Sequence, residues 1–213
     1  MVVRFLHSGL SVTALALISG SLVSLAEARE CDRFVYNTEL VDDVTYCASS
    51  VLPRSRSITY QPGNLEGYDG EGADKAWCEG VRGPGVGEWV EFSTRPGTTI
   101  RKFELMNGYQ KSQRSFYDNA RAREIAVETD SGFRKTFLLA DRFGIQTIEL
   151  GKWYDVKRLK ITIRSVYPGS KYDDLCLSNL SINFEDIREF EWQDLQRSET
   201  MSIPEPQRVP RLQ

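Results

Sequence analysis

The sequence is almost without histidine. Its 213 residues include only His7, which lies in a first segment that we expect to be removed. The rest of the chain therefore cannot build a Ser-His-Asp or Cys-His catalytic site, or the usual catalytic zinc site with histidine ligands. It also lacks a G-x-S-x-G nucleophile motif, so the remaining catalytic route is a carboxylate pair, with Glu79 and Asp174 as the candidates. We expect a protein that is not an enzyme.

A strong charge of one sign and closely spaced cysteines are also missing. The 27 basic and 30 acidic residues give a net charge of −3, and no basic run indicates nucleic-acid binding. The four cysteines are too far apart for a structural zinc site, which needs C-x-x-C pairs. Their even number in an exported chain favours two disulfides, although three pairings exist and free buried thiols are the alternative. We expect Cys31–Cys47 and Cys78–Cys176.

The first 28 residues have the pattern of an export signal. Arg4 precedes an uncharged, mostly apolar stretch at 10–25, and Ala26-Glu27-Ala28 matches the small-x-small cleavage pattern. The stretch is shorter than the roughly 20 apolar residues of a membrane helix. The residues before Cys31 are not those of a lipid-anchor motif. Cleavage leaves 213 − 28 = 185 residues, enough for one domain, in a secreted, periplasmic or cell-envelope location.

The middle of the chain has the pattern of short β-strands separated by turn residues. Leu159, Ile161 and Ile163 show the alternation of a half-buried strand, and no βαβ alternation is present. We expect strands at 47–52, 58–60, 86–92, 99–106, 123–129, 133–139, 146–150, 156–166 and 177–184. Many short strands at this spacing predict an all-β, antiparallel two-sheet sandwich over 46–185. We expect a loosely held lead-in at 29–45, and a short helix with a Pro-rich tail at 186–213.

Two stretches rich in glycine and aromatic residues, at 74–93 and 165–179, share one design. In the first, four glycines and Pro84 break the backbone into turns, which excludes a helix. Loops of this kind on a sandwich commonly carry binding sites. We expect the two stretches to be neighbours in space, tied by Cys78 and Cys176.

Six short motifs, in order along the chain, carry a family resemblance. They are Cys47-Ala-Ser-Ser-Val-Leu52, Ala76-Trp-Cys-Glu-Gly80, Gly85-Val-Gly-Glu-Trp-Val90, Asn107-Gly-Tyr-Gln-Lys111, Asn119-Ala-Arg121 and Tyr167-Pro-Gly-Ser-Lys-Tyr-Asp-Asp174. Together they resemble the discoidin-like glycan-binding domain attached to bacterial secreted NAD glycohydrolases, over about 46–184. The resemblance implies a galactose-binding-like jelly-roll sandwich and a carbohydrate-binding role. It does not imply NAD hydrolysis, because in those toxins the enzyme is a separate domain.

The candidate glycan-binding residues lie in these motifs, and each has a structural alternative. Trp77 could stack on a sugar ring or fill the end of the sandwich beside Cys78, and we favour the second. Tyr109 follows a turn, where an exposed aromatic ring has no role in folding, so we expect it to be exposed and available to a ligand. Arg121 could donate to sugar hydroxyls or an acidic sugar, or pair with Asp118 or a loop carboxylate. For Trp89 we expect a packing role rather than contact with a ligand.

The last motif and Glu79 complete the candidate set. Tyr167, Lys171, Tyr172 and Asp174 lie in one loop, where the carboxylate could accept from sugar hydroxyls or cap a turn. Adjacent residues of an extended strand point to opposite faces, so neighbouring carboxylates alone would not face one substrate.

A structural calcium ion is a further expectation, because related sandwiches often hold one between loop carbonyls and a carboxylate of the last strand. The candidate ligands here are Asn64, Asp69 and Asn179. Asparagine in place of the carboxylate keeps an oxygen ligand but removes a charge, which weakens a site for a hard cation.

These observations together predict an exported, non-catalytic module that binds a glycan or glycoconjugate through the end loops of a β-sandwich. The alternative is a protein-interaction or envelope-scaffold sandwich, and a carboxylate-dependent glycoside hydrolase is less favoured. We expect no nucleic-acid partner and no transmembrane segment after signal cleavage.

Overall fold

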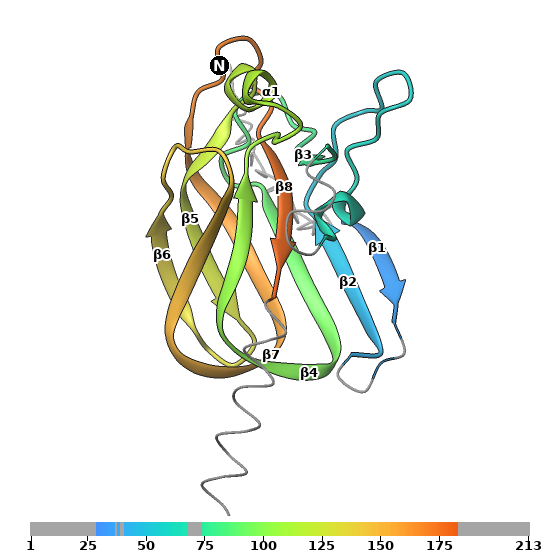
Figure 1. Cartoon of the computed structure of the whole chain (residues 1–213), viewed down its shortest axis with the longest axis vertical. Helices are drawn as coiled ribbons and strands as arrows, with labels where there is room; N and C mark the ends of the chain where they lie inside the picture. The colour runs from blue at the N-terminus through green and yellow to red at the C-terminus, as the bar shows by residue number, and fades with distance from the viewer. Residues whose placement is uncertain (1–28, 37, 39–40, 68–73, 183–213) are drawn as a thin grey trace, which may run out of the picture.

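Figure 1 shows the protein as a computed structural model, which describes residues 29–36, 38, 41–67 and 74–182. The strands are β1 (Glu30–Val35), β2 (Asp43–Ala48), β3 (Trp77–Cys78), β4 (Trp89–Asn107), β5 (Arg121–Thr129), β6 (Arg134–Leu138), β7 (Ile145–Tyr167) and β8 (Cys176–Ser181). The described helices are the α-helix α1 (Gln113–Asp118) and the 3-10 turn η1 (Pro62–Leu65). Neither is long and apolar enough to cross a membrane.

The strands pair in one antiparallel network that folds into two layers (Figure 1). The first layer has the order β1-β2-β4-β7-β5-β6, using the first half of β4 and the second half of β7. In the second layer the other halves of β4 and β7 pair with each other, β8 pairs with β4, and β3 pairs with β8. The predicted jelly-roll sandwich is therefore confirmed.

The long strands β4 and β7 supply both layers because they bend without ending. Pro96 and Gly97 lie where the register of β4 shifts, between Ser93 and Thr98. Proline has no N–H to give to the ladder. Gly151, at the bend of β7, has a φ of +90°, a conformation that favours glycine. These turn residues therefore change the direction of a strand that continues.

Two pairs of predicted strands are joined for this reason, and two other predicted boundaries also differ. The predicted strands 86–92 and 99–106 are the single strand β4, and 146–150 and 156–166 are the single strand β7. The strand predicted at 47–52 ends at Ala48, and the one predicted at 58–60 is a loop with a single bridge between Ser55 and Ile58. The predicted signal at 1–28 and the predicted helix and tail at 186–213 lie outside the described residues.

The prediction of a loosely held lead-in at 29–45 is wrong. Residues 30–35 form β1, which pairs with β2 along its whole length. Phe34 packs against the core and meets the ring of Tyr46 edge-on at 6.2 Å. The stretch is polar because β1 is an edge strand with several exposed side chains.

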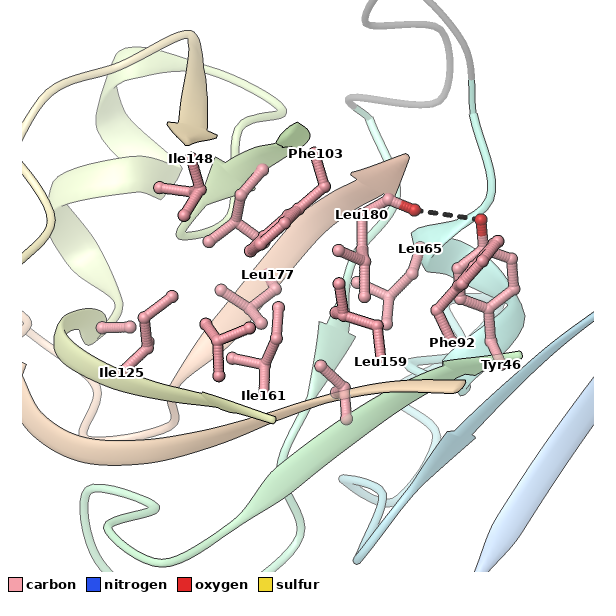
Figure 2. Packing of buried hydrophobic residues seen from close by; sticks show 14 of the residues in the cluster. Tyr46, Leu65, Phe92, Phe103, Ile125, Ile148, Leu159, Ile161, Leu177 and Leu180 are labelled. Atoms are coloured by element: carbon pink, nitrogen blue, oxygen red, sulfur yellow. Dashed lines mark hydrogen bonds between the residues drawn. The ribbon is translucent and has the colours of Figure 1, made fainter. Parts of the chain in front are cut away.

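The core fills the space between the two layers. Leu159 and Ile161 of β7 face Leu177 and Leu180 of β8 (Figure 2), and all four are at most 2% exposed. Tyr46 enters the same core, and its hydroxyl donates to the carbonyl oxygen of Leu180 at 3.0 Å. The alternation in the sequence of β7 thus becomes one apolar face.

Two disulfides join strands that lie side by side, and both are the expected pairs. Cys31–Cys47 links β1 to β2, and Cys78–Cys176 links β3 to β8. The second closes a sequence separation of 98 residues and the first one of 16. The longer loop restricts the unfolded chain more.

We predict that replacing both Cys78 and Cys176 by alanine destabilises the protein more than replacing both Cys31 and Cys47. The chain-entropy relation gives about 4.7 kcal/mol for the long loop and about 3 kcal/mol for the short one. Urea unfolding of the two double variants measures the difference. A larger loss from the Cys31–Cys47 pair would contradict this reasoning.

Candidate functional site

The loops that carry the family motifs gather at one end of the sandwich, around α1 and β3 (Figure 1). The two stretches predicted to be neighbours do meet there, because Trp77 pairs with Leu177 and Cys78 with Cys176. A capping box between Ser112 and Ser115 fixes the start of α1. We call this region the loop end.

The segment 168–175 is held against the end of α1. The N–H groups of Lys171 and Tyr172 both donate to the carbonyl oxygen of Asp118, at 3.1 and 2.8 Å. A Cβ at Gly169 would overlap with the backbone of Asn119 and the carbonyl of Tyr172, so the close approach requires glycine. These contacts fix where Lys171 and Tyr172 are presented.

Trp77 fills the end of the sandwich, as we favoured. Its side chain is fully buried, and its indole N–H donates to the carbonyl oxygen of Ser50 at 2.9 Å. The predicted packing of Trp89 is also seen, since that residue is 5% exposed. In this conformation Trp77 has no surface with which to touch a sugar.

The prediction that Tyr109 is exposed is wrong. The residue is 9% exposed and packs with the Cys78–Cys176 disulfide. Its ring meets that of Tyr60 edge-on at 6.5 Å, and its hydroxyl donates to the carbonyl oxygen of Asp74 at 3.3 Å. Gly108, with a φ of +80°, turns the chain just before it. The disulfide gives this aromatic ring the folding role that the sequence did not reveal.

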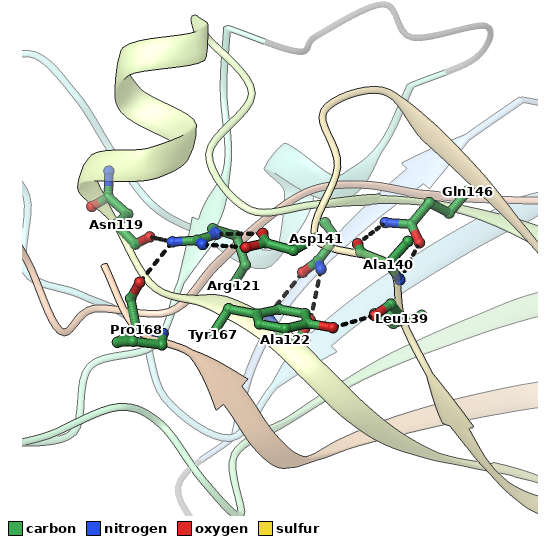
Figure 3. A network of polar contacts seen from close by, with 10 residues as sticks. Asn119, Arg121, Ala122, Leu139, Ala140, Asp141, Gln146, Tyr167 and Pro168 are labelled. Atoms are coloured by element: carbon green, nitrogen blue, oxygen red, sulfur yellow. Dashed lines mark hydrogen bonds and ion pairs between the residues drawn. The ribbon is translucent and has the colours of Figure 1, made fainter. Parts of the chain in front are cut away.

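Arg121 joins three loops (Figure 3). Its guanidinium donates to both carboxylate oxygens of Asp141, at 3.0 and 2.7 Å. It also donates to the carbonyl oxygens of Asn119 and Pro168, at 3.0 and 2.8 Å. Arg121 is 4% exposed, so of its two proposed roles the structure shows the pairing with a loop carboxylate, with Asp141 rather than Asp118 as the partner. No pattern in the sequence singles out Asp141.

Tyr167 and Glu79 also connect loops. The Tyr167 hydroxyl donates to the carbonyl oxygen of Leu139 at 2.8 Å. The Glu79 carboxylate accepts from the N–H of Val81 at 2.7 Å and from that of Leu175 at 3.3 Å. Glu79 is fully buried, and this burial raises its pKa to about 7. The nearby charges of Asp174 and Glu88 raise the pKa further, while the two N–H donors oppose the increase.

Four side chains of the loop end that are at least partly exposed, Tyr60, Lys171, Tyr172 and Asp174, lie near one another. Tyr172 is 44% exposed, and the Lys171 ammonium lies 4.8 Å from its ring centroid. Burial raises the pKa of Tyr60, and the nearby Asp174 and Tyr172 add to it. Tyr60 is not among the predicted residues, although an aromatic side chain directly before the Gln61-Pro62-Gly63 turn is a usable signal. We call these four residues the loop-end patch.

A cavity of about 360 Å³ lies next to this patch. Asp74, Lys75, Tyr109 and Lys111 line one part of it, and the remaining lining residues come from the segment 57–64. Its mixture of charged and polar groups suits a polar ligand better than an apolar one.

The candidate calcium ligands do not fit a cation in the described structure. The Asn179 amide donates to the carbonyl oxygen of Gly67 at 2.8 Å and to that of Leu65 at 3.5 Å. The Asn64 amide donates to the carbonyl oxygens of Thr59 and Ala76. Carbonyls that a cation would need therefore face N–H donors. Asp69 lies outside the described residues, which contain no cluster of three or more His, Cys, Asp or Glu side chains suited to a metal.

We predict that Glu79 makes stability fall as the pH rises from about 4.5 to 7. Its pKa is higher in the folded state than its ordinary value of 4.5, so the folded state loses its proton last and is disfavoured once the unfolded state has ionised. The loss is absent below about pH 4.5, complete above about pH 7, and on the order of 3 kcal/mol.

The measurement is urea unfolding of the natural chain and Glu79→Gln between pH 4 and 8. Other titrating groups contribute equally to both proteins and cancel in the difference. The free energy of unfolding of the natural chain minus that of the variant should therefore decrease as the pH rises. A difference that does not change with pH would show that Glu79 is ionised in the folded state with an ordinary pKa.

Known proteins with a similar structure share only the fold. An arabinofuranosyltransferase, AftD from Mycobacteria, matches with a TM-score of 0.50 at 14% identity, over 71% of this chain. A family 32 carbohydrate-binding module from C. perfringens NanJ, in complex with galactose, matches with a TM-score of 0.48 at 11% identity, over 65% of this chain and 92% of its own. The chain corresponds to only 11% of the arabinofuranosyltransferase. No curated protein gives a significant sequence match.

Family assignment comes from the sequence. The model of the NAD glycohydrolase translocation F5/8 type C domain matches residues 35–184, which is more than half of the chain and includes all the strands from β2 to β8. The loop end and the sandwich described above therefore belong to a member of the NAD glycohydrolase translocation F5/8 type C (discoidin-like) domain family.

Proposed function

We propose that the chain is an exported, non-catalytic module that binds a glycan through the loop-end patch. Membership of a discoidin-like family supports a carbohydrate-binding role. The two disulfides fit an oxidising compartment outside the cytosol. The observation that carries the proposal is the presentation of Tyr172, which is exposed and shares with Lys171 and Asp174 a loop fixed to α1.

The chemistry of the patch suits a sugar. The apolar C–H face of a sugar ring can lie on an aromatic plane, and Tyr172 offers such a plane to solvent. Asp174 can accept from ring hydroxyls and Lys171 can donate to them. One exposed ring offers few contacts, so a single sugar would bind with a Kd on the order of millimolar, or about 4 kcal/mol, unless several copies act together.

Catalysis is disfavoured by the position of Glu79. A glycosidase needs two carboxylates that flank the bond to be cleaved. Glu79, one of the two candidates, has no exposed surface and is bound to the backbone of Val81 and Leu175. Only Asp174 of the pair is partly exposed.

We predict that Tyr172→Ala lowers the affinity for a glycan found on an array by at least about tenfold, because it removes the stacking surface. Tyr36→Ala is the matched control, since Tyr36 is also 44% exposed but follows β1. Titration of the selected glycan into each variant measures the Kd, and the melting temperature verifies that both remain folded.

An equal loss of affinity in the two variants would contradict the proposed site. An array without binding, together with a protein that binds the loop end and is released by Tyr172→Ala, would favour the scaffold role instead.

A further inference from the structure

A second site lies on the outer face of the first layer, away from the loop-end patch. Strand pairing places Glu91 of β4 opposite Lys160 of β7, Lys160 opposite Glu128 of β5, and Glu128 opposite Arg134 of β6. This row faces away from the core, because the next residue of β7, Ile161, is a core residue. A cavity of about 460 Å³ is lined by this row and by Arg29, Trp89, Thr129 and Arg158. We call it the outer-face cavity.

The outer-face cavity has more positive than negative groups. Two carboxylates are shared among three guanidinium groups: Arg29 lies 2.8 Å from Glu91, Arg158 lies 3.8 Å from Glu91, and Arg134 lies 3.7 Å from Glu128. Lys160 is the fourth cation, and its ammonium lies 4.2 Å from the ring centroid of Trp89. The four cations and two carboxylates leave a local excess of two positive charges in a chain whose net charge is −3.

Trp89 supplies a donor that has no acceptor. The residue is 5% exposed, and within the described part of the chain its indole N–H makes no hydrogen bond. Buried polar groups in native proteins almost always have a partner, and an exception needs an explanation. The other buried tryptophan described above, Trp77, satisfies its N–H on a backbone carbonyl. An acceptor oxygen bound in the outer-face cavity would satisfy the N–H of Trp89.

From these observations we infer that the outer-face cavity is a second ligand site, which binds the carboxylate of an acidic sugar. The carboxylate is a planar acceptor that matches the guanidinium fork, and it neutralises part of the positive excess. Glu91 and Glu128 accept from the hydroxyl groups of the same sugar. The choice of a sugar as the carrier of the carboxylate rests on the proposed function, whereas the preference for an oxyanion rests on the cavity alone.

The cross-strand row alone does not account for the outer-face cavity. Its four members, Glu91, Lys160, Glu128 and Arg134, are balanced in charge, and opposite charges on neighbouring strands stabilise the sheet. Arg29 and Arg158 add two cations beyond that balance, and the indole N–H of Trp89 is left without an acceptor in the described part of the chain. The volume of the cavity lies within the range of small-molecule sites.

The test uses the folded chain labelled with ¹⁵N, titrated with tetragalacturonic acid and, as the neutral counterpart, a galactose tetrasaccharide. The indole N–H signal of Trp89, assigned by its absence in Trp89→Phe, should move with the acidic sugar and reach saturation, and should not move with the neutral one. Arg134→Gln combined with Lys160→Gln should raise the Kd at least about tenfold. The control is Lys152→Gln combined with Lys157→Gln, two exposed residues of β7 outside the cavity, which changes the net charge equally.

Equal effects of the two double variants, or a Trp89 signal that does not move, would overturn the inference. Tyr172→Ala separates the two sites. If it abolishes binding of the acidic sugar while the Trp89 signal stays fixed, the sugar binds at the loop-end patch, and the outer-face site is rejected while the proposed function stands. If Tyr172→Ala changes no glycan affinity and the Trp89 signal still responds, the loop-end patch is rejected and the outer-face site stands.

Discussion

The pairing of β4 with β7 holds the molecule together, because the same two strands are central in both layers. Their ladder shifts register at Pro96 and Gly97 and again between Ile100 and Lys102, but the pairing continues on both sides, so the hydrogen bonds of one layer lead into those of the other. Every other strand adds to this pair, directly or through one neighbour. The core between Leu159 and Leu180 exists because the bend turns two apolar faces toward each other. A residue that straightened either bend would therefore separate the layers and the core together.

At the loop end, charged and aromatic side chains hold the loops to one another. Arg121 spans three segments, and Glu79 joins two backbone N–H groups. Tyr109 packs against the Cys78–Cys176 disulfide, and Trp77 packs in the main core. Each of them could have been taken for a ligand contact, and each is nearly without exposed surface. The loops they fix are consequently ordered before any ligand arrives, and a ligand does not have to supply the cost of ordering them.

The sequence was sufficient for the sandwich and for the presence of two disulfides, because alternation and an even cysteine number report local and covalent constraints. Cysteine number alone leaves three pairings, and the observed one was favoured because two loops were expected to be neighbours. It was not sufficient for the extent of strands, since Gly151 and Pro96 look the same whether a strand ends or bends. It also failed for exposure at the loop end. Tyr109 after a turn had the pattern of a surface residue, but the Cys78–Cys176 disulfide, distant in sequence, covers it. The row that links Glu91 to Arg134 could not be seen either, because its members come from four strands and meet only through the pairing register.

The order of strands in the first layer places β1 and β6 at its two ends. An edge strand presents unpaired backbone groups to other chains, and proteins protect such edges with charged side chains. Both strands follow this rule: β1 carries Glu30, Asp32 and Arg33, and β6 carries Arg134 and Lys135. Pairing of two β6 edges from different molecules would bring like charges together and remove part of their hydration. These residues therefore oppose sheet-to-sheet aggregation wherever the protein is concentrated.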